Sequence, residues 1–143
     1  MAQDYGLGGS INVLMAASSI TVPLTRASAV EFHSFEADGT TIMTVTEVDS
    51  TGVNSEQALD VQFKPHKVPG VGGTWTAMAE QDDTVDLGAD ATNDQMRIIV
   101  HGTQLSDGYD GVQVTTDGGI LAAIVVGLIE QAAPANLASN IVA

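Results

Sequence analysis

The sequence predicts an all-β domain, a single β-sandwich or barrel of about eight short strands. Threonine and valine, which favour strands, and glycine and aspartate, which favour tight turns, are prominent in the composition. Segments of β-branched and alternating apolar residues also recur along the chain, separated by turn signals such as Asp38-Gly39. Lysine and the aromatic residues are scarce, and the chain is 44% apolar.

The expected strands follow one another with loops between them. The clearest is 58–64, in which Leu59, Val61 and Phe63 alternate with polar residues. Residues 65–73 hold two prolines and three glycines, so we expect a loop without regular structure there. The eight expected strands are 27–35, 40–48, 58–64, 74–78, 84–87, 95–101, 112–116 and 120–129.

Residues 120–129 (ILAAIVVGLI) contain no polar side chain. Their spacing also suits a helix, and a helix over 120–131 would make the fold α+β. Five β-branched residues in the ten positions, together with Gly127, favour a long buried strand instead. The run is half the length of about 20 residues that a membrane-spanning helix needs. Both of its faces need cover, either from the sandwich or from another subunit.

We expect three parts in the chain: an N-terminal arm over 1–25, the β domain over 26–133 and a C-terminal arm over 134–143. The N-terminal arm has apolar residues without a clean period, and Ile11, Leu14, Met15 and Ser18 suit one helical turn. The alternative for this segment is an edge strand followed by a loop. The arms are expected to contact other subunits. The predicted interface residues are Ile11, Val13, Leu14 and Met15 at one end and Leu137, Ile141 and Val142 at the other.

The charge balance limits the partners. The chain has 18 acidic residues against 4 basic ones, a net charge of −14. Such a surface repels phosphate groups, so we expect neither nucleic acid nor a membrane as a partner. The segment before Ile11 carries Asp4 and no lysine or arginine, which is the wrong charge for a signal peptide.

No catalytic motif is present, and we expect no enzyme activity and no cofactor. The histidines, His33, His66 and His101, are far apart, and the chain has no cysteine, so no metal site is expected. No G-x-S-x-G motif occurs. Trp75, the one tryptophan, is expected to be a core or interface anchor.

Two clusters of carboxylates were compared with calcium loops. The first comprises Asp82, Asp83, Asp86, Asp90 and Asp94, and the second Asp107 and Asp110. Neither has the ligand spacing or the closing glutamate of a calcium-binding loop. We therefore interpret both as exposed turns.

The chain resembles virion proteins of tailed bacteriophages in its threonine-rich strands, Asp-Gly turns and extended arms. The closest resemblance is to head decoration (cement) proteins, small β domains that usually sit as trimers on the capsid. It implies a structural protein at the outer capsid surface, with the major capsid protein and further copies of itself as partners. Two alternatives stay open. One is a tail-tube or head-completion subunit, in which a loop such as 49–57 would cross between subunits. The other is a calcium- or carbohydrate-binding β module of a secreted assembly.

Overall fold

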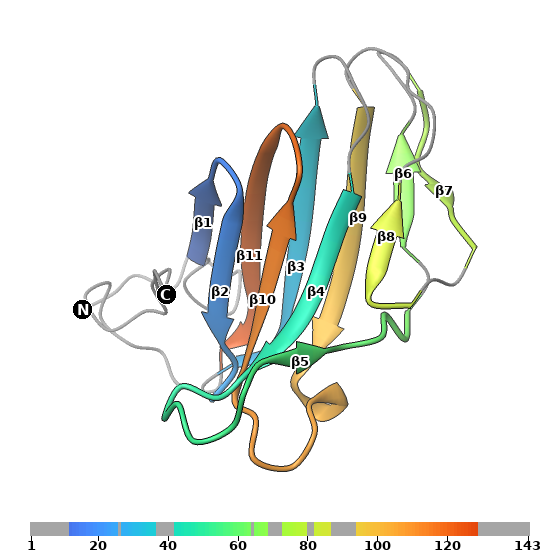
Figure 1. Cartoon of the computed structure of the whole chain (residues 1–143). Helices are drawn as coiled ribbons and strands as arrows, with labels where there is room; N and C mark the ends of the chain where they lie inside the picture. Colours follow the sequence, from blue (N-terminus) through green and yellow to red (C-terminus); the bar gives the residue numbers. More distant parts are fainter. Residues whose placement is uncertain are drawn as a thin grey trace, which may run out of the picture.

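A computed structural model gives the fold as two antiparallel β-sheets packed face to face (Figure 1). The structure describes residues 12–25, 27–36, 42–63, 65–68, 73–79, 82–86 and 94–128. The predicted all-β sandwich is confirmed, with eleven strands and one short 3-10 helix in the described residues instead of about eight strands. No helix in these residues is long and apolar enough to cross a membrane.

Sheet A has six strands in the order β1-β11-β3-β9-β6-β7. The strands are β1 (Asn12–Ala16), β3 (Ala27–Glu36), β6 (His66–Val68), β7 (Thr76–Ala77), β9 (Asp94–His101) and β11 (Ile120–Leu128). The long strands β11, β3 and β9 form its centre, with β1 at one edge and the two-residue β7 at the other.

Sheet B lies in front of sheet A in Figure 1 and has the order β2-β10-β4-β5, with β8 also paired to β4. Its strands are β2 (Ser19–Pro23), β4 (Ile42–Val48), β5 (Gln57–Ala58), β8 (Thr84–Asp86) and β10 (Gly111–Thr116). The 3-10 helix η1 (Gly102–Gln104) follows β9. The chain passes from β1 in sheet A to β2 in sheet B through a short turn, so both strands lie at the same side of the sandwich.

Alternation of side chains explains why these segments form a sandwich. In β9, Met96, Ile98 and Val100 are buried between the sheets, whereas Arg97 and Ile99 are only partly covered on the outer side. One core unites the inner faces of both sheets. Its largest fully buried apolar side chains are Phe32, Ile20, Met43, Met96, Ile98 and Leu121.

Residues 120–128 of the apolar run form strand β11 and not a helix, as the β-branched content predicts. Leu121, Ala123 and Val125 face the core and are at most 2% exposed. Ile120 and Val126 face the other way and remain exposed. The sandwich therefore covers one face of the run and leaves part of the other open.

Several predictions about other segments are wrong. Residues 12–23, expected within an arm carrying a helical turn, form β1 and β2, and Ile20 and Val22 of β2 lie fully in the core. β6 lies in the segment expected to be a loop. Its three residues fall between Pro65 and Pro69 in the sequence, and they form a strand because they pair with β9. Among the described residues 58–63 of the expected strand 58–64, only Ala58 is in a strand, although Leu59 and Val61 are buried as the alternation predicts.

Candidate functional site

The outer face of sheet A carries most of the exposed apolar surface. Eight large hydrophobic side chains are exposed among the described residues, and seven of them lie on this face, Val53 being the exception. Met15 is 69% exposed, Val13 52% and Ile120 50%. We call Val13, Met15, Phe35, Ile120 and Val126 the apolar strip; they come from β1, β3 and β11. The remaining two of the seven are Phe63 and Trp75.

Strand register places these residues side by side. One row of paired residues crosses all six strands of sheet A, in the order Met15, Ala122, His33, Arg97, His66 and Ala77. The next row brings Val13 beside Ile124, followed by Glu31 and Ile99. Since neighbouring strands are about 4.8 Å apart, the strip is a continuous surface along β1 and β11.

The other half of the same face is aromatic and basic. The Arg97 guanidinium carbon lies 5.2 Å from the centroid of the Trp75 ring, a cation–π distance. The ring of His33 meets Trp75 edge-on at a centroid distance of 6.2 Å, and the Phe63 and His101 rings are 4.7 Å apart. We call His33, Phe63, His66, Trp75, Arg97 and His101 the cationic–aromatic patch.

Glu31 lies within this patch and is held by two neighbours. Its Oε1 is 2.8 Å from Nε2 of His33 and 3.4 Å from Nε of Arg97. A hollow of about 340 Å³ opens within this patch. It is lined by Glu31, Phe63, His66, Arg97, Ile98 and Ile99. This volume is at the small end for ligand pockets, so the hollow suits a side chain or a small polar group.

The histidines do not form a metal cluster. His33 and His66 are two strands apart with Arg97 between them in the row, a separation of roughly 10 Å. One ion needs its ligands within about 2 Å of itself. In the described part of the chain, no group of three or more histidine and acidic side chains could hold a metal ion.

The outer face of sheet B has a different character. Its register places Ser19, Thr115, Thr44 and Thr84 in one row across four strands. None of the exposed large hydrophobic side chains in the described residues lies on this face. Large exposed apolar groups are therefore concentrated on the opposite side of the sandwich.

Of the carboxylates expected in exposed turns, Asp107 and Asp110 belong to a hydrogen-bonded loop end. Loop 49–56 folds around Asp49, which accepts hydrogen bonds from N and Oγ1 of Thr51 at 2.8 and 2.6 Å and from N of Asn54 at 2.9 Å. These hydrogen bonds lower the pKa of Asp49 from 3.8 to about 2, and the bond from the Thr51 hydroxyl has the largest effect.

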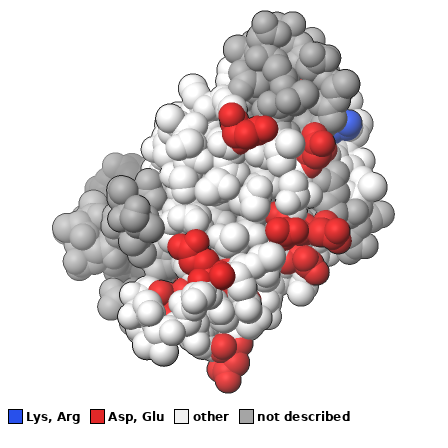
Figure 2. Space-filling model, in the orientation of Figure 1, with Lys and Arg blue, Asp and Glu red and all other residues white. Residues whose placement is uncertain are grey.

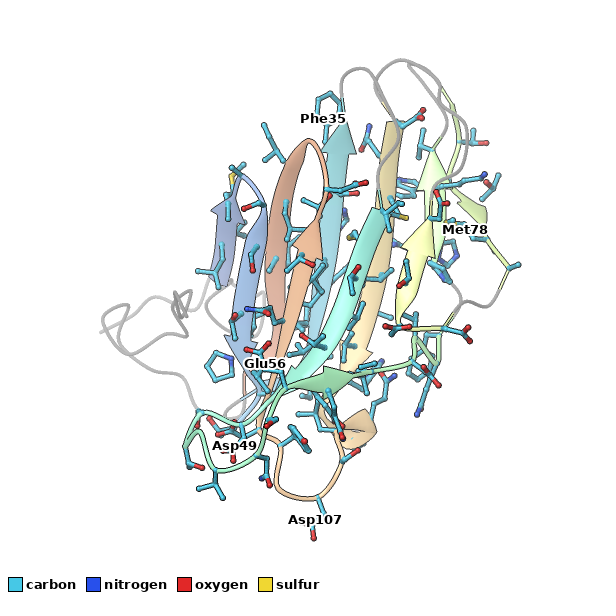
Figure 3. All side chains as sticks on the ribbon, viewed as in Figure 1. Phe35, Asp49, Glu56, Met78 and Asp107 are labelled. Carbon is cyan, nitrogen blue, oxygen red and sulfur yellow. The ribbon has the colours of Figure 1, made fainter. Side chains whose placement is uncertain are left out.

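A second loop, 105–110, is bonded to the first. Asp110 accepts hydrogen bonds from N and Oγ of Ser50, and the Tyr109 hydroxyl donates to the Ser55 carbonyl at 2.8 Å. A hollow of about 260 Å³ opens beside these loops, between Thr21, Pro23 and Val48. We call loops 49–56 and 105–110 together the acidic loop end (Figure 3).

Buried Glu47 joins this end to the core. Its carboxylate accepts a hydrogen bond from N of Ser106 at 2.8 Å and one from the Gln57 side chain, and the residue is 1% exposed. Asp82, Asp83 and Asp86 lie apart from the loop end beside β8, Asp94 is buried, and Asp90 lies outside the described residues.

The predicted interface residues have different positions. Val13 and Met15 project from the outer face of β1, whereas Leu14 turns inward and packs against the core. Ile11, Leu137, Ile141 and Val142 lie outside the described residues. Sequence reasoning missed Phe35, Ile120 and Val126, although the run 120–129 was predicted to need cover on both faces. Trp75 is not in the core, because 41% of it is exposed on the outer face.

No protein-family model matches the chain, and comparison with curated proteins and with solved structures gives no match.

Proposed function

We propose that this chain is a virion structural protein, a capsid decoration (cement) protein that associates as a homotrimer and binds the major capsid protein at the outer capsid surface. Its role is structural and not enzymatic. It clamps neighbouring capsid subunits and so stabilises the head.

The observation that carries the proposal is the apolar strip. Exposed apolar side chains are ordinary when scattered, but a contiguous group on one face of a domain is typical of a protein–protein interface. Val13, Met15 and Ile120 are at least half exposed and lie on the adjacent strands β1 and β11. Burial of such side chains against another subunit would stabilise an assembly by about 25 cal/mol for each Å² removed from water.

The edges of the sheets support the same role. β5 and β7 end their sheets with two residues each, which leaves little backbone open to pairing. β1 is longer, with five residues and neither charge nor proline, and its outer edge is free of a strand partner within the described residues. A subunit that docks at this side can bury the apolar strip and pair with the β1 backbone. A specific interface of this kind covers about 800 Å² on each partner.

Loop 49–57 is folded compactly on its own domain, so it does not favour the tail-tube alternative, in which it would extend across to another subunit. Most of its backbone and side-chain bonds go to its own residues and to loop 105–110. We therefore keep the decoration role as the single proposal.

Incubation with icosahedral capsids of the parent virus tests this function. We expect the purified chain to sediment with capsids that lack it and to raise the temperature at which they break open. Substitution of both Val13 and Met15 by aspartate should remove both effects, while the same substitutions at Thr44 and Thr115 on sheet B should not. Capsids that neither bind the chain nor change in stability would contradict the proposal.

A further inference from the structure

Charge is distributed unevenly over the sandwich. Both described basic residues, Lys67 and Arg97, and all three histidines belong to β3, β6 and β9 of sheet A. Glu31 is the one carboxylate that these strands turn outward among the described side chains, and its Oε1 lies beside Nε2 of His33 and Nε of Arg97. Figure 2 shows the opposite side, where carboxylates spread over the described surface and a basic side chain is visible at the margin.

The acidic loop end has the complementary properties. Glu56 and Asp107 are exposed there, and their carboxylates make no hydrogen bond to the described residues. Figure 3 shows both near Asp49 at the end of the sandwich that lies away from Phe35. Val53, 82% exposed, projects from the same loops, which the bonds to Asp49 and Asp110 hold in one conformation.

We propose that the cationic–aromatic patch of one copy receives the acidic loop end of a second copy. Glu56 and Asp107 approach Arg97 and His66, and Val53 packs on the exposed rings of Phe63 and Trp75. This inference rests on the proposed self-assembly and adds a second contact between copies to the one made by the apolar strip.

Charge repulsion supports this arrangement over the alternatives. Copies with a net charge of −14 repel one another unless the contact pairs unlike charges. Two copies that met patch to patch would bring Arg97 against Arg97. A contact between patch and loop end pairs opposite charges and uses two different surfaces of each chain. Such heterologous contacts close into rings when the rotation between copies allows it, and a trimer is the smallest ring.

The loops are a suitable ligand because they are already ordered. Association costs conformational freedom when a loop must be fixed on binding. Here Asp49 and Asp110 fix the loops in the free chain, so Glu56 and Asp107 are presented without that loss. For this reason the test changes Glu56 and Asp107 and leaves Asp49 and Asp110 intact.

Charge reversal tests the contact by sedimentation equilibrium of the full chain. The loop variant is E56K/D107K, and the patch variant is R97E/H66E. We expect each to raise the dissociation constant of the assembly at least about tenfold. Combining all four substitutions in one chain should restore association, because unlike charges then face each other at every contact. Mixing the two variants should restore it in part, since unlike charges face each other at two of the three contacts of a trimer.

A matched control carries the same charge change elsewhere. D60K/D82K alters two exposed carboxylates that lie outside the loop end and should leave association at least as strong as in the wild type. Thermal unfolding shows whether the patch variant is folded, and the loop variant tests the contact independently of it. An unchanged dissociation constant in the loop variant, or no recovery on mixing folded variants, would overturn this inference and leave self-assembly standing. A wild-type chain that stays monomeric at all concentrations would instead overturn the proposed self-assembly.

Discussion

Asp49 shows how one side chain can determine the shape of a loop. Its carboxylate accepts hydrogen bonds from Thr51 and Asn54, and they lower its pKa from 3.8 to about 2. A carboxyl whose pKa is lowered in the folded state stabilises that state fully above its unfolded pKa. That stabilisation disappears as the pH falls from about 4 through 2, so the loop should remain closed at all higher pH values.

Acid titration followed by NMR tests this account. The amide signals of Thr51 and Asn54 should move together with a midpoint near pH 2, because both donate to the same carboxylate. In an Asp49→Asn variant, this titration should be lost. A wild-type midpoint near 4 would mean that the hydrogen bonds do not hold the carboxylate, and the loop would then lack the rigidity assigned to it.

Glu47 links the loop end to the core through side-chain hydrogen bonds. Replacing Glu47 with alanine leaves the Ser106 amide and the Gln57 side chain without their acceptor. We expect the free energy of unfolding to fall by about 2–3 kcal/mol, since the truncation removes a side chain that is 1% exposed together with the two hydrogen bonds that it accepts. Urea unfolding measures the change.

Two substitutions serve as comparisons for Glu47→Ala. Glu47→Gln keeps the side-chain volume but loses one acceptor oxygen, so its effect should be smaller than that of alanine. Glu56→Ala removes an exposed carboxylate and should change stability by less than about 0.5 kcal/mol. Equal stability of Glu47→Ala and Glu56→Ala would show that the buried bonds contribute little.

At the scale of the strand, Gly127 explains how β11 stays close to β3 near its end. Gly127 has φ +63, and a Cβ there would lie 1.8 Å from Oγ of Ser28. The same residue weakened the helix prediction for this run, and in the strand it permits close approach of two backbones.

Gly127→Ala should lower the free energy of unfolding by about 2 kcal/mol or more, through backbone strain and the contact with Ser28. Gly52→Ala is the matched control, because Gly52 also has positive φ (+72) but has open space around its Cβ position. Adding Ser28→Ala should recover part of the loss at Gly127, as thermal unfolding can show. Equal losses at Gly52 and Gly127 would mean that the contact with Ser28 has no effect.

The elements also show what local pattern can and cannot predict. Strands β3, β4, β9, β10 and β11 were predictable because their apolar and β-branched residues reflect burial on a sheet. β6 was not, since its three residues lie between prolines and become a strand only by pairing with β9. Leu59 and Val61 are buried as predicted but do not lie in a strand. Pairing into a strand depends on partners distant in the sequence, which the local pattern does not contain. β1 was missed because its outward residues, Val13 and Met15, are as apolar as its inward ones.

For the whole molecule, the candidate site could be predicted only in part. Val13 and Met15 were predicted as interface residues from their place in an apolar segment. Sequence alone could not bring them beside Ile120 and Phe35, because that neighbourhood follows from the pairing of β1, β11 and β3. The gathering of Trp75, Arg97 and the three histidines likewise follows from strand order. The proposed assembly therefore depends on one claim about the whole chain, that copies meet at the outer face of sheet A.

Light scattering coupled to size-exclusion chromatography tests this claim most directly. The wild-type chain should elute with three times the mass of one chain, and a Met15→Asp/Ile120→Asp variant should elute as a folded monomer. Thr44→Asp/Thr115→Asp, with the same added charge on sheet B, should remain a trimer. A monomeric wild type, or a Met15→Asp/Ile120→Asp variant that keeps the wild-type mass, would contradict the claim.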